Sequence, residues 1–375
     1  MSEERWQLPE AMRPPSTVTP ESFTEWRAAR TGAGNPERMT NPVWVWLARH
    51  PEISAYQAYK HFGGDGTGRS AGWTNHRFGQ TRTVLPDGRT LAIAGEHEDG
   101  YDPDFWIYND VIVTAPNGDV EIYGYLRDAF PPTDFHSATL VGDHLYLVGN
   151  LGYANSRRRR AQVLRMHTGT LAVEPVETTG EDPGWIFEHQ ATRSDDGSSI
   201  TVSRGQCDIQ RGERHFLREA IDDYVLDLTT LIWTRLTDRR WQQFELARGD
   251  GRIGNLWDIS QLADYVERPD DEFCAQQAAK YRERLGREPD LDAWRSRFQP
   301  PVPHEELPRD DDEWRVHRIR VDGTIVRYVD DHRGARVVIE GAVPASVVSA
   351  LLDDLRTKLS RADTGPYVVV SLDDA

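Results

Sequence analysis

The chain has few cysteines, no long apolar run and no excess of positive charge. Only Cys207 and Cys274 occur among 375 residues. They lie far apart and outside any CxxC pair, which argues against a disulfide framework and against a cysteine zinc site. The N-terminal MSEERWQLPEAMRPP lacks the apolar core of a signal peptide, and no stretch is long and apolar enough for a membrane helix. We therefore expect a cytoplasmic protein that makes no contact with a membrane.

The charge balance is strongly acidic. Lys and Arg number 44 against 61 Asp and Glu, a net charge of −17. Such a surface repels phosphate backbones, so we expect no nucleic-acid partner. The acidity serves solubility, and it would also suit a basic protein partner. With 38% hydrophobic residues, including 12 Trp, the chain can bury a sizeable core.

Signatures of known chemistry are missing as well. No GxSxG, HExxH, dinucleotide fingerprint or Cys-His metal pattern occurs. GGDGTGRS, residues 63–70, is close to a phosphate loop but has Arg69 where lysine is needed. A helix rather than a strand is expected before it, so we interpret it as a linker.

Three helix-start signals occur within residues 1–72. Thr19 precedes Pro20 in TPESFTEWRAAR, Asn41 precedes Pro42 in NPVWVWLARH, and Ser54 precedes AYQAYKHF. Gly63 would cap the third helix. The sequence predicts a small helical region at 1–72.

From about residue 74, short alternating runs predict β structure, and three segments repeat. In each, a polar anchor opens a strand, a turn follows, and a second strand ends near a glycine. The segments are RFGQTRTVLPDGRTLAIAGE, DFHSATLVGDHLYLVGN and FEHQATRSDDGSSITVSRG, with anchors Gln80, His136 and His189 and glycines Gly95, Gly149 and Gly205. A variable loop and two more strands follow each glycine. Each unit therefore has four strands, the size of a propeller blade.

The repeats resemble those of the kelch-repeat β-propeller family, which is similar to the galactose oxidase central domain. The resemblance rests on FHSATLVGDHLYLVGN, on Asn109-Asp110 and Asp222-Asp223 before the third strand, and on Trp233 in the fourth. It runs roughly from Thr74 to Trp241. The usual double glycine is absent, and Gln80 replaces the expected histidine. Since propellers have four to eight blades, the resemblance implies further blades in QQFELARGDGRIGNLWDISQL (242–262) or around Trp73 or Trp314, unless the sheets pack without closing.

The C-terminal part differs in pattern. Residues 263–312 predict helices followed by a Pro-rich acidic linker. Residues 313–375 predict a strand pair with a turn at Asp322-Gly323, a third strand, a helix and a last strand. We expect a mainly β fold: a kelch-like β-propeller or partial propeller at 73–262, with N-terminal helices (1–72), a helical segment and linker (263–312), and a small C-terminal α/β unit (313–375).

In a propeller, the loop between the second and third strands shares a face with the connection into the next blade. The acidic stretch GEHEDGYDPDFWIYND and the basic run SRRRRAQ are two such loops. The predicted binding face comprises Glu96, His97, Glu98, Asp99, Asp102, Asp104, Asp134, His136, Arg157, Arg158, Glu188 and His189. The basic run is a solvated face, an orienting surface for a charged partner, or an internal salt link between loops.

Imidazoles and carboxylates on this face could hold a divalent metal. The candidate ligands are His97, Asp102, Asp104, His136 and His189. Their spacing matches no defined calcium loop. Partner binding and simple solvation stay open for the acidic loop, and the anchors His136 and His189 serve either structure or acid–base chemistry. We predict no cofactor, although a divalent metal stays possible.

Two functions of different class are compatible with these residues. The first is a non-catalytic kelch-like propeller that binds a protein partner through its charged loops, as kelch domains often do. The alternative is an enzyme acting on a small molecule at the channel mouth, with or without a metal, because some kelch propellers are sugar isomerases, copper oxidases or iron-dependent lyases. The copper oxidases rely on a tyrosine cross-linked to a cysteine. Only Cys207 lies within these repeats, which gives that chemistry little support.

Overall fold

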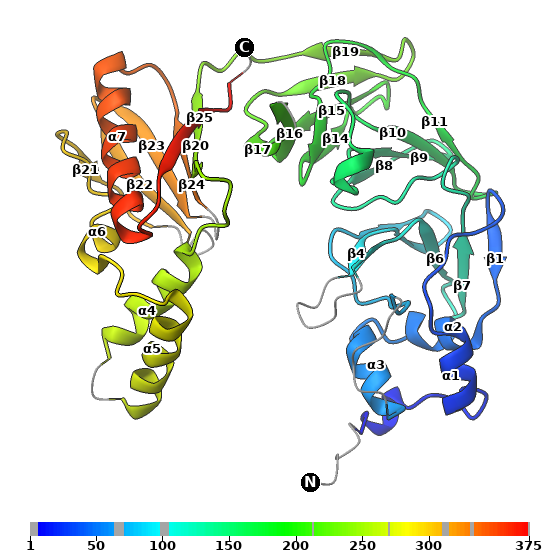
Figure 1. Cartoon of the computed structure of the whole chain (residues 1–375). Helices are drawn as coiled ribbons and strands as arrows, with labels where there is room; N and C mark the ends of the chain where they lie inside the picture. The colour runs from blue at the N-terminus through cyan, green and yellow to red at the C-terminus, as the bar shows by residue number, and fades with distance from the viewer. Residues whose placement is uncertain are drawn as a thin grey trace. The chain divides into compact units, whose positions relative to one another are not determined.

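The computed structural model describes residues 7–63, 71–97, 105–211, 214–268, 271–309, 315–330 and 334–373. The chain forms two compact units, Met1–Asp238 and Arg239–Ala375 (Figure 1). Both units contain antiparallel sheets, and the fold is mainly β as predicted. No helix in the described stretches is long and apolar enough to cross a membrane.

Short helices open the first unit where the capping signals predict them. The side chains of Thr19, Asn41 and Ser54 accept backbone N–H groups of the first helical turns, and Gly63 adopts a φ of 84° after the last helix. The elements are η1 (Glu10–Met12), α1 (Pro20–Trp26), α2 (Pro42–Ala48) and α3 (Ala55–His61).

Three four-stranded antiparallel sheets follow, and their strands coincide with the three repeats. In the order of hydrogen-bonded neighbours, the first sheet consists of β7 (Val120–Gly124), β6 (Asp110–Thr114), β3 (Thr90–Ile93) and β2 (Thr81–Val84). The second consists of β11 (Val173–Pro175), β10 (Val163–His167), β9 (His144–Val148) and β8 (Ser137–Val141). The third consists of β19 (Ile232–Arg235), β18 (Tyr224–Asp227), β15 (Ser199–Ser203) and β14 (Gln190–Arg193). The strand β8 contacts both β2 and β14, so the anchor-bearing strands of the three sheets are neighbours.

Other strands lie outside the repeats. The first and third sheets each gain a fifth strand, β1 (Glu37–Met39) beside β7 and β12 (Thr179–Gly180) beside β19. The loops predicted to be variable contain structure of their own. In the first, β4 (Glu96–His97) pairs with β5 (Trp106–Ile107); the second holds η2 (Ala154–Ser156); and the third holds the hairpin of β16 (Gln206–Arg211) and β17 (Arg214–Glu219). The strand β13 (Trp185–Phe187), in the connection into the third repeat, pairs with β16 and completes a small sheet.

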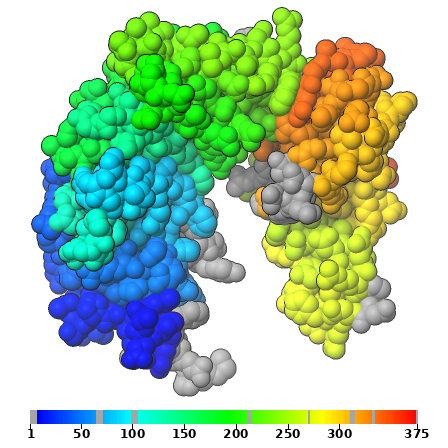
Figure 2. Space-filling view, turned by 180° about the vertical axis from the view of Figure 1, so that it is seen from behind, coloured from blue at the N-terminus to red at the C-terminus, as the bar shows by residue number. Residues whose placement is uncertain are grey.

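Alternating side chains bury the first two sheets on both faces. In β3, Leu91 belongs to the apolar cluster shared with the second sheet, while the next residue, Ala92, belongs to the cluster shared with the N-terminal helices. In β9, Leu147 belongs to the cluster shared with the first sheet, and the next residue, Val148, belongs to the cluster shared with the third sheet. Since the side-chain period of a strand is two, neighbouring residues face opposite partners. Figure 2 shows the helices, in blue, against the first sheet, in cyan.

The third sheet is apolar on one face only. Ile200 and Val202 point into the cluster shared with the second sheet and are 0% exposed. Thr201 points the other way and lies beside Val225, which in turn pairs with the exposed Thr234. A further blade would need an apolar face here, and this face is largely polar. Within residues 71–238 as described, the other sheets are the two-stranded β4–β5 and the three-stranded β13–β16–β17, and neither has the four strands of a blade.

The second unit is built on a six-stranded antiparallel sheet. Its strand order is β21 (Glu305–Glu306), β22 (Val316–Val321), β23 (Thr324–Asp330), β24 (Gly334–Ile339), β20 (Gln242–Arg248) and β25 (Tyr367–Ser371). The helices of this unit are α4 (Leu256–Val266), α5 (Glu272–Leu285), α6 (Leu291–Arg295) and α7 (Ala345–Ala362). The predicted turn between β22 and β23 is present, with φ of 48° at Asp322 and 83° at Gly323.

The prediction that residues 242–262 could supply another blade is wrong. Strand β20 lies between β24 and β25 in the second unit. The helix α4 follows it and buries Leu256, Ile259 and Leu262, which are spaced by about one helical turn. Trp73 lies outside the strands as well, and Trp314 lies outside the described residues. Residues 239–262, assigned to the blades from sequence, thus belong to the second unit, where the expected parts 263–312 and 313–375 share one hydrophobic cluster.

Candidate functional site

The two anchor histidines link neighbouring sheets. Nε2 of His136 lies 2.9 Å from the Thr81 hydroxyl, and Nε2 of His189 lies 2.9 Å from the Ser137 hydroxyl. Burial lowers the pKa of His136 to about 3 and that of His189 to about 4. Both rings are therefore neutral at pH 7. At the equivalent position of the first repeat, Gln80 Nε2 donates to Asn75 Oδ1, 3.3 Å away, and so, among the described residues, makes no bond to a neighbouring repeat through this amide group.

The residue before each anchor has the left-handed conformation. The φ angles are 61° at Gly79, 49° at Phe135 and 54° at Glu188. The Phe135 N–H donates to the Gly79 carbonyl at 2.9 Å, and the Glu188 N–H donates to the Phe135 carbonyl at 2.8 Å. Main-chain hydrogen bonds thus join the starts of the three repeats and hold the nearby loops in a set arrangement. Repetition of this strained geometry argues for a structural role of the anchors.

Asp134 contacts both the first loop, which follows Gly95, and the second loop, which follows Gly149. It is 0% exposed, and its Oδ1 accepts the Gly152 N–H at 2.6 Å. Burial raises the pKa of Asp134, whereas the bond from Gly152, a hydrogen bond with the Glu96 carboxyl group and the charge of Arg157 lower it. The two carboxyl groups, from β4 and from the segment before β8, therefore lie together as a pair. A carboxyl with a raised pKa keeps its proton to higher pH and can donate a hydrogen bond.

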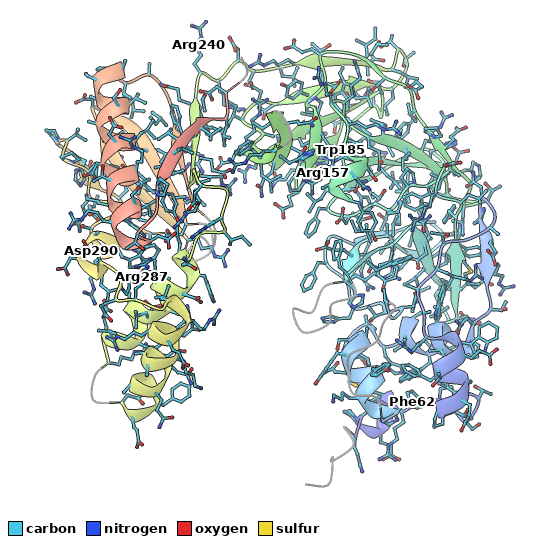
Figure 3. All side chains as sticks on the ribbon, viewed as in Figure 1. Phe62, Arg157, Trp185, Arg240, Arg287 and Asp290 are labelled. Atoms are coloured by element: carbon cyan, nitrogen blue, oxygen red, sulfur yellow. The ribbon has the colours of Figure 1, made fainter. Side chains whose placement is uncertain are left out.

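An ion pair joins the second loop to the third. Arg157 Nη1 lies 2.7 Å from Asp208 Oδ1, and the second oxygen of Asp208 lies 2.8 Å from His215 Nδ1. The Asp208 side chain is 4% exposed and that of Arg157 is 15% exposed. The Leu151 carbonyl accepts from both Arg157 Nε and Trp185 Nε1, each at 3.0 Å. Figure 3 shows Arg157 and Trp185 side by side. Arg157 thus forms a salt link between the second loop and the third, whereas the sequence interpretation considered a link to the acidic first loop.

The rest of the basic run reaches the surface. Arg158 and Arg159 are exposed, and Arg160 pairs with Asp182 at 2.9 Å. On the neighbouring loop, Phe105 is 40% exposed. Its ring meets that of Tyr153 edge to face, with centroids 5.8 Å apart. This part of the surface combines arginine with aromatic rings.

The structure brings together only some of the predicted residues. Glu96, Asp134 and Arg157 lie together, while Arg158 points outward, and Glu188 accepts from Gln206 Nε2 at 2.8 Å. The histidines are less available: His136 and His189 lie inside the sheet stack, and the buried Nδ1 of His97 is 3.4 Å from the Tyr108 hydroxyl. Four predicted residues lie outside the described ones: Glu98, Asp99, Asp102 and Asp104. Among the described residues, no group of three or more His, Cys, Asp or Glu side chains is placed to hold a metal.

The sequence interpretation missed Asp208, His215 and Trp185. All three belong to the small sheet β13–β16–β17. Asp208 and His215 lie in the loop after Gly205 that was predicted to be variable, whereas Trp185 lies in the connection that enters the third repeat. The alternation of apolar and polar residues in QCDIQR and RHFLRE could have indicated this hairpin. We define the loop face as the set of residues Glu96, His97, Phe105, Asp134, Tyr153, Arg157–Arg160, Trp185, Asp208 and His215. Of these, Phe105 and Arg158–Arg160 are exposed, whereas His97, Asp134 and Trp185 are buried.

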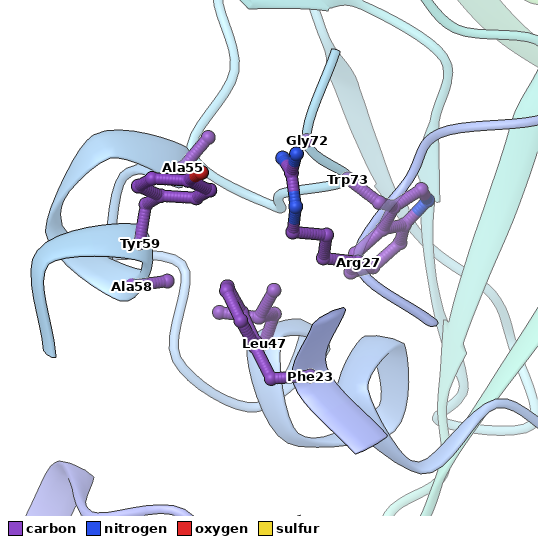
Figure 4. A pocket seen from close by; sticks show the side chains of 8 residues that line it. All are labelled: Phe23, Arg27, Leu47, Ala55, Ala58, Tyr59, Gly72 and Trp73. Carbon is purple, nitrogen blue, oxygen red and sulfur yellow. The ribbon is translucent and has the colours of Figure 1, made fainter. Parts of the chain in front are cut away.

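A separate hollow lies among the N-terminal helices (Figure 4). The space inside it that a water molecule can reach is about 10 Å³, room for roughly one water. One charged side chain, Arg27, lies among apolar and aromatic ones. The lining residues are Phe23, Arg27, Leu47, Ala55, Ala58, Tyr59, Gly72 and Trp73. The sequence interpretation assigned no site here.

Comparison with known proteins is sparse. No family model and no curated protein matches the chain. Among solved structures it resembles one described as "Structure of YjhT", with a TM-score of 0.30 and 14% sequence identity. The match covers 43% of this chain and 52% of that one, so the chain spans about half of that structure's length. A similarity this low carries no argument about fold or function.

Proposed function

We propose that the first unit is a partial propeller of kelch-like blades that acts as a non-catalytic module and binds a protein partner through the loop face. The observation that carries the proposal is the state of the anchors. His136 and His189 are neutral, buried and hydrogen-bonded to Thr81 and Ser137. Residues in that state hold strands together and do not exchange protons with a substrate at neutral pH.

The chemistry of the loop face supports protein binding. Interfaces between proteins are enriched in arginine and aromatic residues, and a few such side chains carry most of the binding free energy. Arg158 and Arg159 are exposed, and the ring pair of Phe105 and Tyr153 lies on the same set of loops. The Arg157–Asp208 ion pair and the main-chain links between the repeats limit the motion of these loops, which lowers the entropy cost of binding. The partner we expect has an acidic surface with at least one apolar side chain.

The test begins with affinity capture on the immobilised full chain, followed by mass spectrometry and calorimetric titration of the purified partner. The double charge reversal Arg158→Glu with Arg159→Glu should weaken binding at least tenfold and should reduce the salt dependence of the affinity. The matched control reverses Arg13 and Arg49, which are also exposed and belong to the N-terminal region. It changes the net charge by the same amount and should leave the affinity unchanged.

Two results would contradict the proposal. One is capture of no protein whose affinity survives purification. The other is equal weakening by both variant pairs, because that would reflect net charge rather than a specific surface.

A second candidate is an enzyme at the loop face, favoured by the carboxyl pair of Asp134 and Glu96. Burial raises the pKa of Asp134, and a carboxyl with a raised pKa can act as a general acid. Asp134 itself is buried, whereas Glu96 is half-buried. Metal content of the purified protein, measured with melting before and after chelation, tests the metal-dependent form. Stoichiometric metal and a lower melting temperature after chelation would favour it, whereas no metal and unchanged melting would eliminate it.

A further inference from the structure

We propose that the edge strand β25 (Tyr367–Ser371) is a docking surface for a second copy of this chain. The second copy adds its own β25 in antiparallel pairing and so continues the sheet across a two-fold axis. The strand belongs to the second unit and shares no residue with the loop face. The inference is therefore independent of the function proposed for the first unit.

One side of β25 carries main-chain groups that meet no other strand. The Leu372 N–H donates to the Gln243 carbonyl at 2.8 Å, so the main chain at Leu372 faces β20. Since these groups alternate in direction along a strand, those of Ser371 and Val369 point away from β20. Within the described residues, β25 pairs with β20 on one side and with no strand on the other (Figure 1). Val369 thus presents an N–H and a carbonyl to the open side.

The strand lacks the features that usually protect an edge. PYVVVSL, residues 366–372, contains no charged side chain, and the pairing of β25 with β20 has no bulge. Val369 packs against the helix-covered core, so Val368 and Val370 lie on the opposite face of the sheet, where Val368 is 40% exposed. An exposed apolar edge without such protection is a template for pairing with another chain.

A two-fold axis beside Val369 matches the strand to itself. Val369 would exchange both main-chain hydrogen bonds with Val369 of the second copy, and the Ser371 N–H would donate to the Tyr367 carbonyl across the axis. Val368 would stand opposite Val370 in a non-hydrogen-bonded pair, the kind in which side chains approach more closely. The exposed valine would therefore be buried against an apolar side chain, which stabilises the pairing.

The neighbouring groups do not oppose this register. The Tyr367 N–H, which also faces the open side, donates to the Ser360 hydroxyl at 3.1 Å and needs no partner in the second copy. Asp373, the first charged residue after the strand, would stand opposite Gly365 rather than opposite another carboxylate. The net charge of −17 repels two copies at longer range, and this repulsion is screened beyond about 6 Å at an ionic strength of about 0.3 M.

Sedimentation equilibrium of the full chain at this ionic strength tests the pairing. Strands of five residues make a small interface, so we expect a reversible dimer, and protein concentrations up to about 0.5 mM detect a Kd of about 1 mM or tighter. Val368→Lys places an ammonium group beside Val370 of the second copy and should weaken the dimer at least tenfold. The matched control is Val84→Lys, at a strand valine of the first unit that is 69% exposed. It adds the same charge and should leave the Kd unchanged.

Amide hydrogen exchange locates the contact and keeps the test decisive if Val368→Lys disturbs folding, which circular dichroism will show. In the native chain, exchange at Val369 and Ser371 should slow in proportion to the fraction of dimer that sedimentation gives. The proposal is overturned if the native chain stays monomeric up to about 0.5 mM, a concentration that detects a Kd of about 1 mM. It is also overturned if folded Val368→Lys dimerises as the native chain does, or if exchange in β25 is the same in monomer and dimer.

Discussion

Replacing both anchor histidines by glutamine should remove a large part of the acid sensitivity of the first unit. Glutamine already stands at the equivalent position of the first repeat, Gln80, so the backbone there accommodates an amide. The change His136→Gln with His189→Gln keeps a hydrogen-bonding side chain near Thr81 and Ser137. It removes the two groups whose pKa burial lowers most clearly in the sheet stack.

The magnitude follows from proton linkage. In the unfolded chain a histidine has a pKa near 6.5, whereas the folded pKa values are about 3 for His136 and about 4 for His189. Below pH 6.5 the unfolded state therefore binds more protons than the folded state. The stabilisation is fully present above pH 6.5 and is lost as the pH falls toward the folded values. On going from pH 7 to pH 5, each histidine lowers the free energy of unfolding by about 2 kcal/mol, so the pair lowers it by about 4 kcal/mol.

Urea unfolding at pH 7 and pH 5, followed by tryptophan fluorescence, measures this difference. On going from pH 7 to pH 5 the native chain should lose about 4 kcal/mol more than the double variant. Carboxylates with a lowered pKa, such as Asp196 and Asp250 at about 2, lose their contribution to folding stability at lower pH. They do so equally in the native chain and in the double variant. The variant His76→Gln, at an exposed histidine of the same unit, is the control. Identical pH dependence in the native chain and the double variant would refute the assignment of neutral, buried anchors.

Three further predictions concern stability. Asp110→Ala should destabilise the first unit by about 3–5 kcal/mol, because the fully buried Arg77 guanidinium would lose the carboxylate that lies 2.5 Å from it. Urea unfolding at pH 7 measures the change, and a loss of stability below about 1 kcal/mol would contradict this prediction. Gly149→Ala should lower the melting temperature more than Gly118→Ala. Both glycines have positive φ, but a Cβ at Gly149 would lie 2.4 Å from the Ile186 carbonyl oxygen, while Gly118 has nothing within 4 Å; equal shifts would show that only the backbone conformation matters. Asp363→Ala should speed amide hydrogen exchange in β20 and β25, because this buried carboxylate accepts from several side chains, including Arg248 at 3.1 Å and the Tyr367 hydroxyl at 2.9 Å; unchanged exchange would mean that the network adds no stability there.

Local patterns were sufficient for most of the elements. The capping residues Thr19, Asn41 and Ser54 start the three N-terminal helices, and the Asp322-Gly323 turn joins β22 to β23. The spacing of the anchors located three four-stranded sheets correctly. The capping and turn signals involve residues a few positions apart and fix the backbone locally, whereas the repeat was found from the similarity of segments whose anchors are 56 and 53 residues apart.

Assignment of strands to sheets could not be made in the same way. QQFELAR has the pattern of a strand in either location, yet β20 pairs with β24 and β25 rather than with a blade. A strand specifies its two faces through alternation but not which distant edge it joins. Similarly, the hairpin β16–β17 lies in a loop that the repeat alignment treated as variable, because each repeat has a different insertion there.

The candidate site depended still more on tertiary structure. Arg157 and Asp208 are 51 residues apart, and nothing in their local sequence relates them. Asp134 and Glu96 meet because the end of β3 lies beside the segment before β8, where the Gly95 N–H donates to the Thr133 carbonyl at 2.9 Å. The acidic stretch GEHEDGYDPDFWIYND contributes a half-buried Glu96 and a buried His97 to the described part of the loop face.

The sequence by itself determined the secondary elements, the repeated four-strand unit and the polar anchor that opens each repeat. Tertiary structure alone decided what the anchors do. His136 and His189 would be candidate acids and bases in water, but apolar sheets on both sides remove the solvent that stabilises a charged ring, so they stay neutral and bond to Thr81 and Ser137. Protonation depends on the surroundings that distant strands create, and those surroundings are not encoded in the spacing of neighbouring residues.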